Sequence, residues 1–135
     1  MRTLALIAHD NKKVDLVAWA TYNRETLARH PLVATRNTAR LVRDKVGLDV
    51  EALLSGPEGG DAQIAARVAT RGVAGVFFFV DPLSAQPHDP DIRALLRVCN
   101  VHNVPLAMNV ATADLVIASL APGGVEPPGT SVRAC

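Results

Sequence analysis

A glycine-rich segment, SGPEGGD at residues 55–61, is the part of the sequence that most suggests chemistry. Glycine has no Cβ, so the backbone can approach a ligand closely, and successive backbone N–H groups in such loops bind anions. We predict that this segment brings N–H groups to an anion and directs the Asp61 carboxylate at a carbon-bound proton. Two other interpretations stay open: a glycine turn without a ligand, and Asp61 as a helix cap, a common role of aspartate.

Two further segments carry acid–base groups. HDNKK contains His9, Asp10 and Lys13, and DPLSAQPHDPD contains His88 and Asp91. Imidazole and carboxylate groups serve general acid–base catalysis, whereas lysine and loop N–H groups favour an anion of phosphate size. The mixture points to a small phosphorylated ligand with an acidic C–H or a transferable proton. Surface histidines and ordinary turn chemistry remain the alternative.

Apolar runs alternate with amphipathic stretches along the chain. Continuous apolar runs are typical of strands covered on both faces, and apolar residues at helical spacing indicate helices between them. The pattern predicts an α/β fold with a five-stranded parallel sheet and helices on both of its faces. We expect strands at residues 3–8, 32–35, 50–55, 73–80 and 104–109, and helices at 12–29, 39–46, 62–71, 92–103 and 113–120.

The predicted strand order along the chain gives the candidate site its position. Ligands of parallel sheets bind at the carboxyl ends of the strands, where the winding reverses. HDNKK follows the first expected strand, Thr35–Thr38 the second, SGPEGGD the third and DPLSAQPHDPD the fourth. Polar and charged residues therefore converge on one edge of the sheet, which is the main residue-level argument for a functional site.

The composition describes one soluble globular domain. The chain has 135 residues, a formal net charge of +1, 49% apolar and 20% charged residues, so no nucleic-acid or membrane partner is expected. We expect a domain at residues 1–121 and a mobile, Pro/Gly-rich tail at 122–135. No secretory signal is expected, and the cysteine use fits a reduced cytoplasm. Trp19 and Phe77–Phe79 are interpreted as packing residues and Cys99 as a core residue.

The three chemically rich segments, together with VPLAMNVATAD at residues 104–114, resemble those of the methylglyoxal synthase family. SGPxGGD combined with DPLxAxPHxPD is a specific pattern, and the resemblance extends over the whole chain except the tail. It implies a three-layer α/β/α sandwich. It also implies a lyase that converts dihydroxyacetone phosphate to methylglyoxal and inorganic phosphate through an enediolate, without metal or organic cofactor. Members are cytoplasmic homohexamers inhibited by phosphate, so a homohexamer is expected here.

The resemblance also implies roles for individual residues. Asp61 matches the catalytic base, His88 the histidine that contacts substrate oxygens and moves protons, and Asp91 an acidic residue supporting the site. Asp10 matches another acidic residue, which pairs with Arg97 of a neighbouring subunit. The remaining matches are ligand contacts: His9, Lys13, Ser55 and Gly56.

The second loop departs from the family pattern. The family sequence is close to ATGTTG, and here residues 34–39 read ATRNTA. Thr35 and Thr38 are retained as expected phosphate contacts, together with Asn37. Arg36 replaces a glycine, and either adds a charge-assisted contact to the anion or points to solvent. Because arginine and alanine tolerate positive φ poorly, the geometry of this loop is left open.

Two alternative functions compete with the lyase. The same fold occurs as a regulatory, ligand-sensing domain fused to carbamoyl phosphate synthetase, which needs anion-binding loops but no base. The presence of Asp61, His88 and Asp91 favours the enzyme. A metal-dependent hydrolase using His9, Asp61, His88 and Asp91 is the third possibility, and no HxxH or HExxH spacing supports it.

Overall fold

The computed structural model describes residues 2–121, and the predicted tail at 122–135 lies outside them. Strands and helices alternate along this part of the chain, as the sequence pattern predicts. The strands are β1 (Leu4–Ala8), β2 (Leu32–Ala34), β3 (Glu51–Ala52), β4 (Gly75–Phe79) and β5 (Leu106–Ala107). The helices are α1 (Lys13–Tyr22), α2 (Arg24–Leu27), α3 (Arg36–Leu41), α4 (Gly60–Ala69), α5 (Asp89–Val101) and α6 (Val110–Leu120). Short 3-10 helices lie at Asp10–Lys12 and Gly56–Glu58, and a π-helical turn lies at Val42–Val46.

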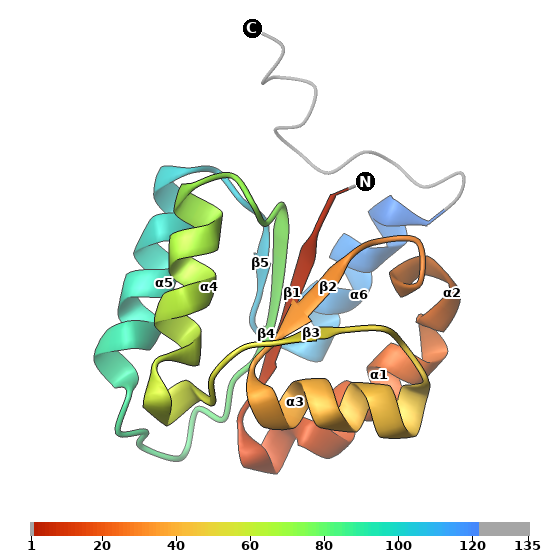
Figure 1. Ribbon diagram of the computed structural model, residues 1–135, viewed down its shortest axis with the longest axis horizontal. Coiled ribbons are helices and arrows are strands. Elements are labelled where there is room, and N and C mark those ends of the chain that lie inside the picture. The colour runs from red at the N-terminus through yellow and green to blue at the C-terminus, as the bar shows by residue number, and fades with distance from the viewer. Residues whose placement is uncertain (1, 122–135) are drawn as a thin grey trace, which may run out of the picture.

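All five strands are parallel and lie in the order β3-β2-β1-β4-β5. Helices α4 and α5 lie together on one side of the sheet, and α1, α3 and α6 lie on the other (Figure 1). The predicted three-layer α/β/α sandwich is therefore confirmed. The chain winds outward from β1 through β2 to β3 and then returns to β4 on the other side of β1. The winding thus reverses between β1 and β4, which is where a ligand site is expected.

The central strand β1 is buried along its whole length, because its side chains alternate between two cores. Leu4, Leu6 and Ala8 face the core shared with α1, α3 and α6, and Ala5 and Ile7 face the core shared with α4 and α5. Each fully buried leucine or phenylalanine side chain stabilises the fold by about 1.5–3 kcal/mol. The continuous apolar run of the sequence therefore marks a strand covered on both faces, as predicted.

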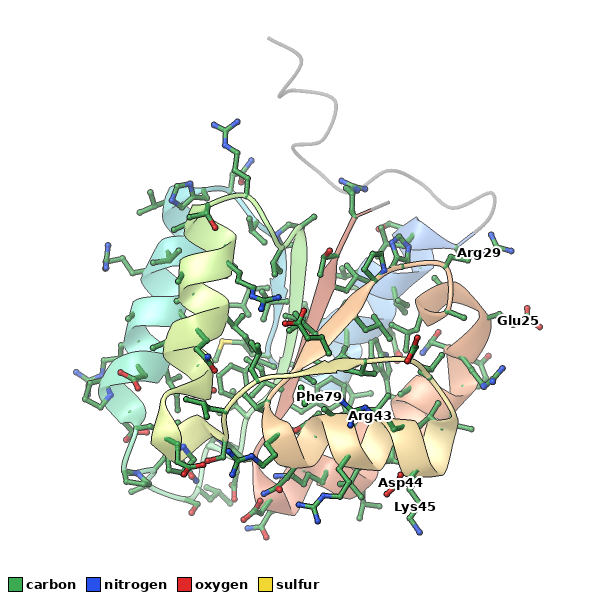
Figure 2. The ribbon with its side chains drawn as sticks, viewed as in Figure 1. Glu25, Arg29, Arg43, Asp44, Lys45 and Phe79 are labelled. Atoms are coloured by element: carbon green, nitrogen blue, oxygen red, sulfur yellow. The ribbon has the colours of Figure 1, made fainter. Side chains whose placement is uncertain are left out.

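Aromatic side chains fill one of these cores. The ring centroid of Trp19 lies 4.8 Å from that of Phe77 and 5.4 Å from that of Phe79. Phe79 lies in the middle of the molecule, whereas Asp44 and Lys45 extend outward from the surface (Figure 2). The prediction that the tryptophan and the phenylalanines serve packing is confirmed for these residues.

Several predicted boundaries are wrong. The helix expected over residues 12–29 is interrupted at Asn23, whose side-chain amide donates to the Trp19 carbonyl oxygen at 2.9 Å. Helix α3 begins at Arg36, whereas the sequence pattern predicts a start at Ala39. Helices α4 and α5 likewise begin before the expected residues 62 and 92. Residues placed in loops by the sequence pattern, among them Asp61 and Asp91, therefore lie in first helical turns.

The strand ends also differ from expectation. Strands β3 and β5 have two residues each, although the sequence pattern predicts strands at 50–55 and 104–109. Both are edge strands with a single neighbour, so fewer ladder hydrogen bonds extend them. The predicted stop at Gly47 is confirmed, because this glycine adopts φ +76° and its N–H donates to the Val42 and Arg43 carbonyl oxygens. Between residues 2 and 121, every helix is too short or too polar to cross a bilayer.

Candidate active site

A cavity of about 190 Å³ lies at the carboxyl ends of the first four strands, beside the reversal of winding. It receives residues from each of the four segments that the sequence analysis placed at this edge. The prediction that these segments converge is therefore confirmed. The lining residues are Ile7, Ala8, His9, Asp10, Lys13, Thr35, Asn37, Ser55, Gly56, Pro57, Asp61, Gln86 and His88.

Asp61 is fully buried at the wall of this cavity, with 0% of its surface exposed. Within residues 2–121 neither carboxylate oxygen has a hydrogen-bond partner, and Nε2 of His88 lies 3.3 Å from Oδ2. Burial raises the pKa of Asp61 to about 6. The N-cap of α4 is Gly59, and no side chain caps this helix. Asp61 is therefore not a helix cap but an unsatisfied carboxylate facing a cavity.

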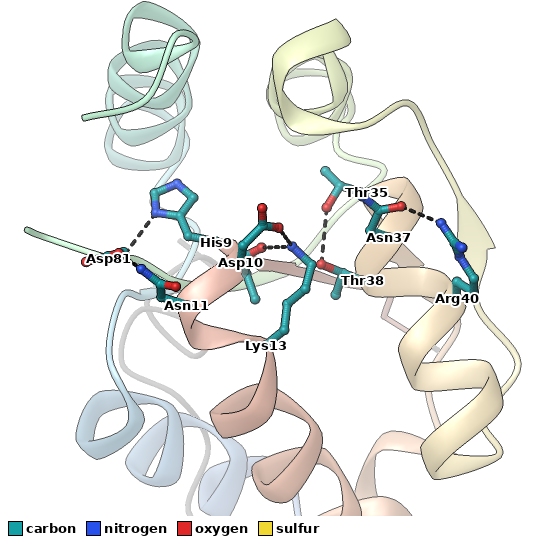
Figure 3. Close-up of polar contacts among 10 residues, drawn as sticks. His9, Asp10, Asn11, Lys13, Thr35, Asn37, Thr38, Arg40 and Asp81 are labelled. Atoms are coloured by element: carbon teal, nitrogen blue, oxygen red, sulfur yellow. Dashed lines mark hydrogen bonds and ion pairs between the residues drawn. The ribbon is translucent and has the colours of Figure 1, made fainter. Parts of the chain in front are cut away.

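His9 is held in one tautomer. The backbone N–H of Asp81 donates to Nδ1 of His9 at 2.9 Å, so in the neutral ring the proton resides on Nε2 (Figure 3). Burial, followed by the neighbouring charge of His88, lowers the pKa of His9 below its usual value. Nε2 is buried and has no partner among the described residues. The site therefore contains a neutral imidazole with a free N–H donor.

The loop after β4 is fixed by two hydrogen bonds to the carboxylate of Asp81. The Asn11 side-chain amide donates to Oδ2 at 2.9 Å, and the Leu83 N–H donates to Oδ1 at 3.0 Å. These bonds also hold the pKa of Asp81 below its usual value. The sequence pattern places Asp81 and Asn11 in segments that converge on this edge of the sheet, but it does not predict the hydrogen bond between them. Their spacing of 70 residues offers no local signal, although the position of Asp81 at the end of a strand does.

Lys13 brings a cation to the cavity. Its Nζ donates to the Ala8 carbonyl oxygen at 3.1 Å and to Oδ1 of Asp10 at 2.6 Å (Figure 3). The lysine side chain is 17% exposed, whereas that of Asp10 is 92% exposed. The hydrogen bond from Lys13 lowers the pKa of Asp10. One of the three ammonium donors is left for a ligand, as the prediction of an anion contact at Lys13 requires.

The histidine pair closes the site on the side of β4. The rings of His9 and His88 meet edge to face, with centroids 5.9 Å apart. His88 is buried, and its Nδ1 has no hydrogen-bond partner within residues 2–121. The two imidazoles and the Asp61 carboxylate thus lie together, and Nε2 of His9 and Nδ1 of His88 have no hydrogen-bond partner among the described residues. Gln86 also lines the cavity, although it stands at an unspecified position of the DPLxAxPHxPD pattern.

Glycine is required at two positions of the SGPEGGD loop. A Cβ built on Gly56 would lie 2.7 Å from Nε2 of His88, and one on Gly60 would lie 2.1 Å from the Leu54 carbonyl oxygen. Both distances are shorter than Cβ contacts in real proteins. Gly56 therefore lets the histidine ring lie against the loop, and Gly60 lets helix α4 begin directly against the end of β3.

The second loop enters the site only in part. Thr35 and Asn37 line the cavity, and the Thr35 hydroxyl contacts that of Thr38 at 3.4 Å (Figure 3). Arg36 does not line the cavity: its Nη1 lies 3.0 Å from Oε1 of Glu58. Of the two outcomes left open for this arginine, exposure to solvent is the one observed: the side chain is 50% exposed, and its guanidinium pairs with a carboxylate of the neighbouring loop.

Four expected site residues lie outside the cavity lining: Arg36, Thr38, Asp91 and Arg97. Asp91, in the first turn of α5, donates its N–H to the His88 carbonyl oxygen at 2.9 Å, and its charge contributes to the raised pKa of Asp61. Arg97 is exposed farther along the same helix. In the part of the chain that the structure describes, no group of three His, Cys, Asp or Glu residues could hold a metal ion.

Known proteins resemble this chain over nearly its whole length. The MGS-like domain family matches residues 11–108. A methylglyoxal synthase of Thermus thermophilus is 53% identical over 91% of this chain and 98% of its own length. That of Cupriavidus pinatubonensis is 55% identical over 92% of this chain and 95% of its own length.

A solved structure shares the fold as well as the sequence. The crystal structure of methylglyoxal synthase from Elizabethkingia anophelis NUHP1 superposes with a TM-score of 0.82 at 45% identity, and covers 87% of this chain and 78% of that one. The buried carboxylate, the paired histidines and the glycine loop come from the segments that carry the sequence resemblance. The chain belongs to the methylglyoxal synthase family.

Proposed function

We propose that the protein is a lyase that converts dihydroxyacetone phosphate to methylglyoxal and inorganic phosphate. One observation carries the proposal: the carboxylate of Asp61 is fully buried at the cavity, and neither oxygen accepts a hydrogen bond from another described residue. Leaving a buried carboxylate unsatisfied costs about 1–3 kcal/mol or more. Such a cost is typical of a group held ready for a ligand.

In the first step, Asp61 removes a proton from the hydroxymethyl carbon of the substrate. A pKa of about 6 leaves the carboxylate mostly ionised at neutral pH and makes it a stronger base than an exposed aspartate. The electron pair of the broken C–H bond moves to the carbonyl oxygen, and an enediolate forms. The free N–H of His9 donates to this oxygen, and His88 exchanges protons between the two enediolate oxygens. Donors fixed in advance supply much of the rate.

In the second step, the enediolate expels phosphate. As the C–O bond to the phosphate breaks with its electron pair, the double bond shifts toward that carbon, and the terminal hydroxyl loses its proton to become the aldehyde. The resulting enol takes a proton at the former phosphate-bearing carbon and gives up its O–H proton, which yields methylglyoxal. Expulsion requires this bond to lie out of the enediolate plane, whereas an in-plane bond favours reprotonation to an isomer. We propose that Lys13, Ser55, Gly56, Thr35 and Asn37 hold the phosphate in the out-of-plane position, with Thr38 supporting Thr35.

The family relationship supports further proposals about assembly and control. We propose a cytoplasmic homohexamer in which inorganic phosphate, as a product, also inhibits. Asp10 has its carboxylate 92% exposed, and Arg97 is exposed on α5, so both are available to a neighbouring subunit. Asp91 is proposed to support catalysis by its charge near Asp61 rather than by direct contact.

A single assay tests the lyase against both alternatives. Purified protein is incubated with dihydroxyacetone phosphate, with and without a chelator, and methylglyoxal and phosphate are measured over time. Equimolar release of both products, unchanged by chelator, is the expected result. Binding of the substrate without turnover would favour the sensing domain, and loss of activity with chelator would favour the metal-dependent hydrolase.

A further inference from the structure

Glu58 lies at the outer rim of the site. A carboxylate at this position would repel an anionic ligand. It is the last residue of the short helix Gly56–Glu58, between the proposed phosphate contacts and Asp61. Its side chain is 56% exposed and does not line the cavity. Glu58 nevertheless accepts a hydrogen bond from Ser55, which does line the cavity.

One oxygen of Glu58 holds two groups that suit an incoming phosphate. The Ser55 hydroxyl donates to Oε1 at 2.8 Å, and Nη1 of Arg36 lies 3.0 Å from the same atom. Ser55 lines the cavity at the end of β3, and Arg36 opens helix α3 at the end of β2. The carboxylate therefore joins the two loops that flank the proposed phosphate position.

A hydroxyl group has one proton to donate. While Ser55 donates to Glu58, it cannot donate to a phosphate oxygen. The guanidinium of Arg36 is likewise directed at Glu58 rather than at the cavity. Two groups that the resemblance and the loop sequence assign to phosphate are thus engaged by a carboxylate on the same rim.

We propose that Glu58 is a built-in competitor for the phosphate group, which must displace it from Ser55 and Arg36 to bind fully. The inference rests on the proposed function, because it takes the phosphate of substrate and product as the displacing anion. Glu58 then sets the affinity of the site, and does so without contacting the reacting carbons. Removing it should tighten the binding of phosphate and of substrate and leave the chemical step unaltered.

The test compares Glu58→Met, which removes both the charge and the strong acceptor, with Glu58→Gln, which removes only the charge. Calorimetry with inorganic phosphate should give a Kd roughly three- to fivefold lower for Glu58→Met than for the natural protein, with a smaller change for Glu58→Gln. KM for dihydroxyacetone phosphate should fall in parallel, while kcat stays unchanged. Adding Ser55→Ala to Glu58→Met should remove the part of the gain that comes from the freed hydroxyl, and leave the part that comes from Arg36.

A matched control is the pair of Glu51 and Arg67, which has similar exposure and lies away from the cavity. Glu51→Met changes the net charge equally and should leave both Kd and KM unchanged. The proposal is overturned if Glu58→Met binds phosphate no more tightly than the natural protein, or if Glu51→Met tightens binding equally. Natural protein that neither binds phosphate nor turns over would instead refute the proposed function.

Discussion

Nε2 of His88 lies 3.3 Å from Oδ2 of Asp61, and no described residue gives that carboxylate a hydrogen bond. The imidazole and the carboxylate are therefore adjacent, but no hydrogen bond joins them. A structural ion pair would be closer and would have its remaining oxygens satisfied. The arrangement leaves both groups able to exchange a proton with a ligand that lies between the loop after β3 and the loop after β4.

Replacing Asp61 with Asn should abolish turnover and leave phosphate binding intact. The amide has nearly the same shape but cannot accept the carbon-bound proton, so kcat should fall by about 10²- to 10⁴-fold. Steady-state kinetics measures the loss, and calorimetry with inorganic phosphate measures the retained binding. Turnover near that of the natural protein would show that Asp61 is not the base.

The same substitution should stabilise the protein at neutral pH. Burial raises the pKa of Asp61 from 3.8 to about 6, so the folded state binds more protons than the unfolded state between these values. The preference of the folded state for protonated Asp61 therefore stabilises the protein fully below pH 3.8, and this stabilisation is lost as pH rises through 6 and the buried carboxyl group ionises. Asp61→Asn should therefore raise the free energy of unfolding at about pH 7.5 by an amount on the order of 3 kcal/mol, and by almost nothing near about pH 3.5. Urea unfolding at both values checks this, and an equal effect at both would contradict the raised pKa.

His9 should be neutral at neutral pH, with its proton on Nε2. Burial lowers its pKa, and the Asp81 N–H occupies Nδ1. Nitrogen-15 NMR of the histidine rings distinguishes the two neutral tautomers and the charged ring. A charged ring at neutral pH, or a proton on Nδ1, would remove His9 as the neutral donor to the enediolate.

Replacing Lys13 with Ala should weaken the binding of every phosphate compound. A hydrogen bond to a charged group is worth about 1.5–3 kcal/mol, so KM for the substrate and Ki for phosphate should each rise by about 10- to 100-fold. Lys12→Ala is the adjacent control, since Lys12 does not line the cavity. Unchanged KM and Ki in the Lys13 variant would contradict its role.

Adding a methyl group at Gly56 should displace His88. The new Cβ would lie 2.7 Å from Nε2, and the ring must move to accommodate it. Misplacement by about 1 Å can cost about 10²-fold in rate, so kcat should fall by that factor while the protein stays folded. At Gly72 an added Cβ would lie 3.4 Å from the nearest atom, so Gly72→Ala is the control and should retain its activity. Equal kcat in the two variants would show that close approach at Gly56 does not position the histidine.

Long-range order is predictable from the sequence, and local detail at the site is not. The apolar run at β1 and the alternation of elements specify a parallel sheet, and this sheet brings His9, Asp61 and His88 to one edge. The start of α3 at Arg36 cannot be read from its own residues, because Thr and Asn favour helix formation weakly. The start of α3 depends on tertiary contacts, such as the hydrogen bond from the Arg36 N–H to the Leu54 carbonyl oxygen.

The partner of Arg36 is hidden from the sequence for a similar reason. Its approach to Glu58 joins residues far apart in the chain, on loops that only the folded sheet places side by side. Charge and residue type show that an arginine replaces a glycine of the family pattern. They cannot show which of several nearby groups it meets, because that depends on where two helices begin.

The cavity at the reversal of winding draws on loops that follow four different strands, from His9 to His88. No contiguous stretch of the polypeptide holds the base, the imidazoles and the phosphate contacts at once. A nascent or cleaved chain would carry many of the reactive side chains yet have no enclosed place in which to use them. Competence to release a reactive aldehyde therefore arises only when the first four strands and the loops that follow them have come together.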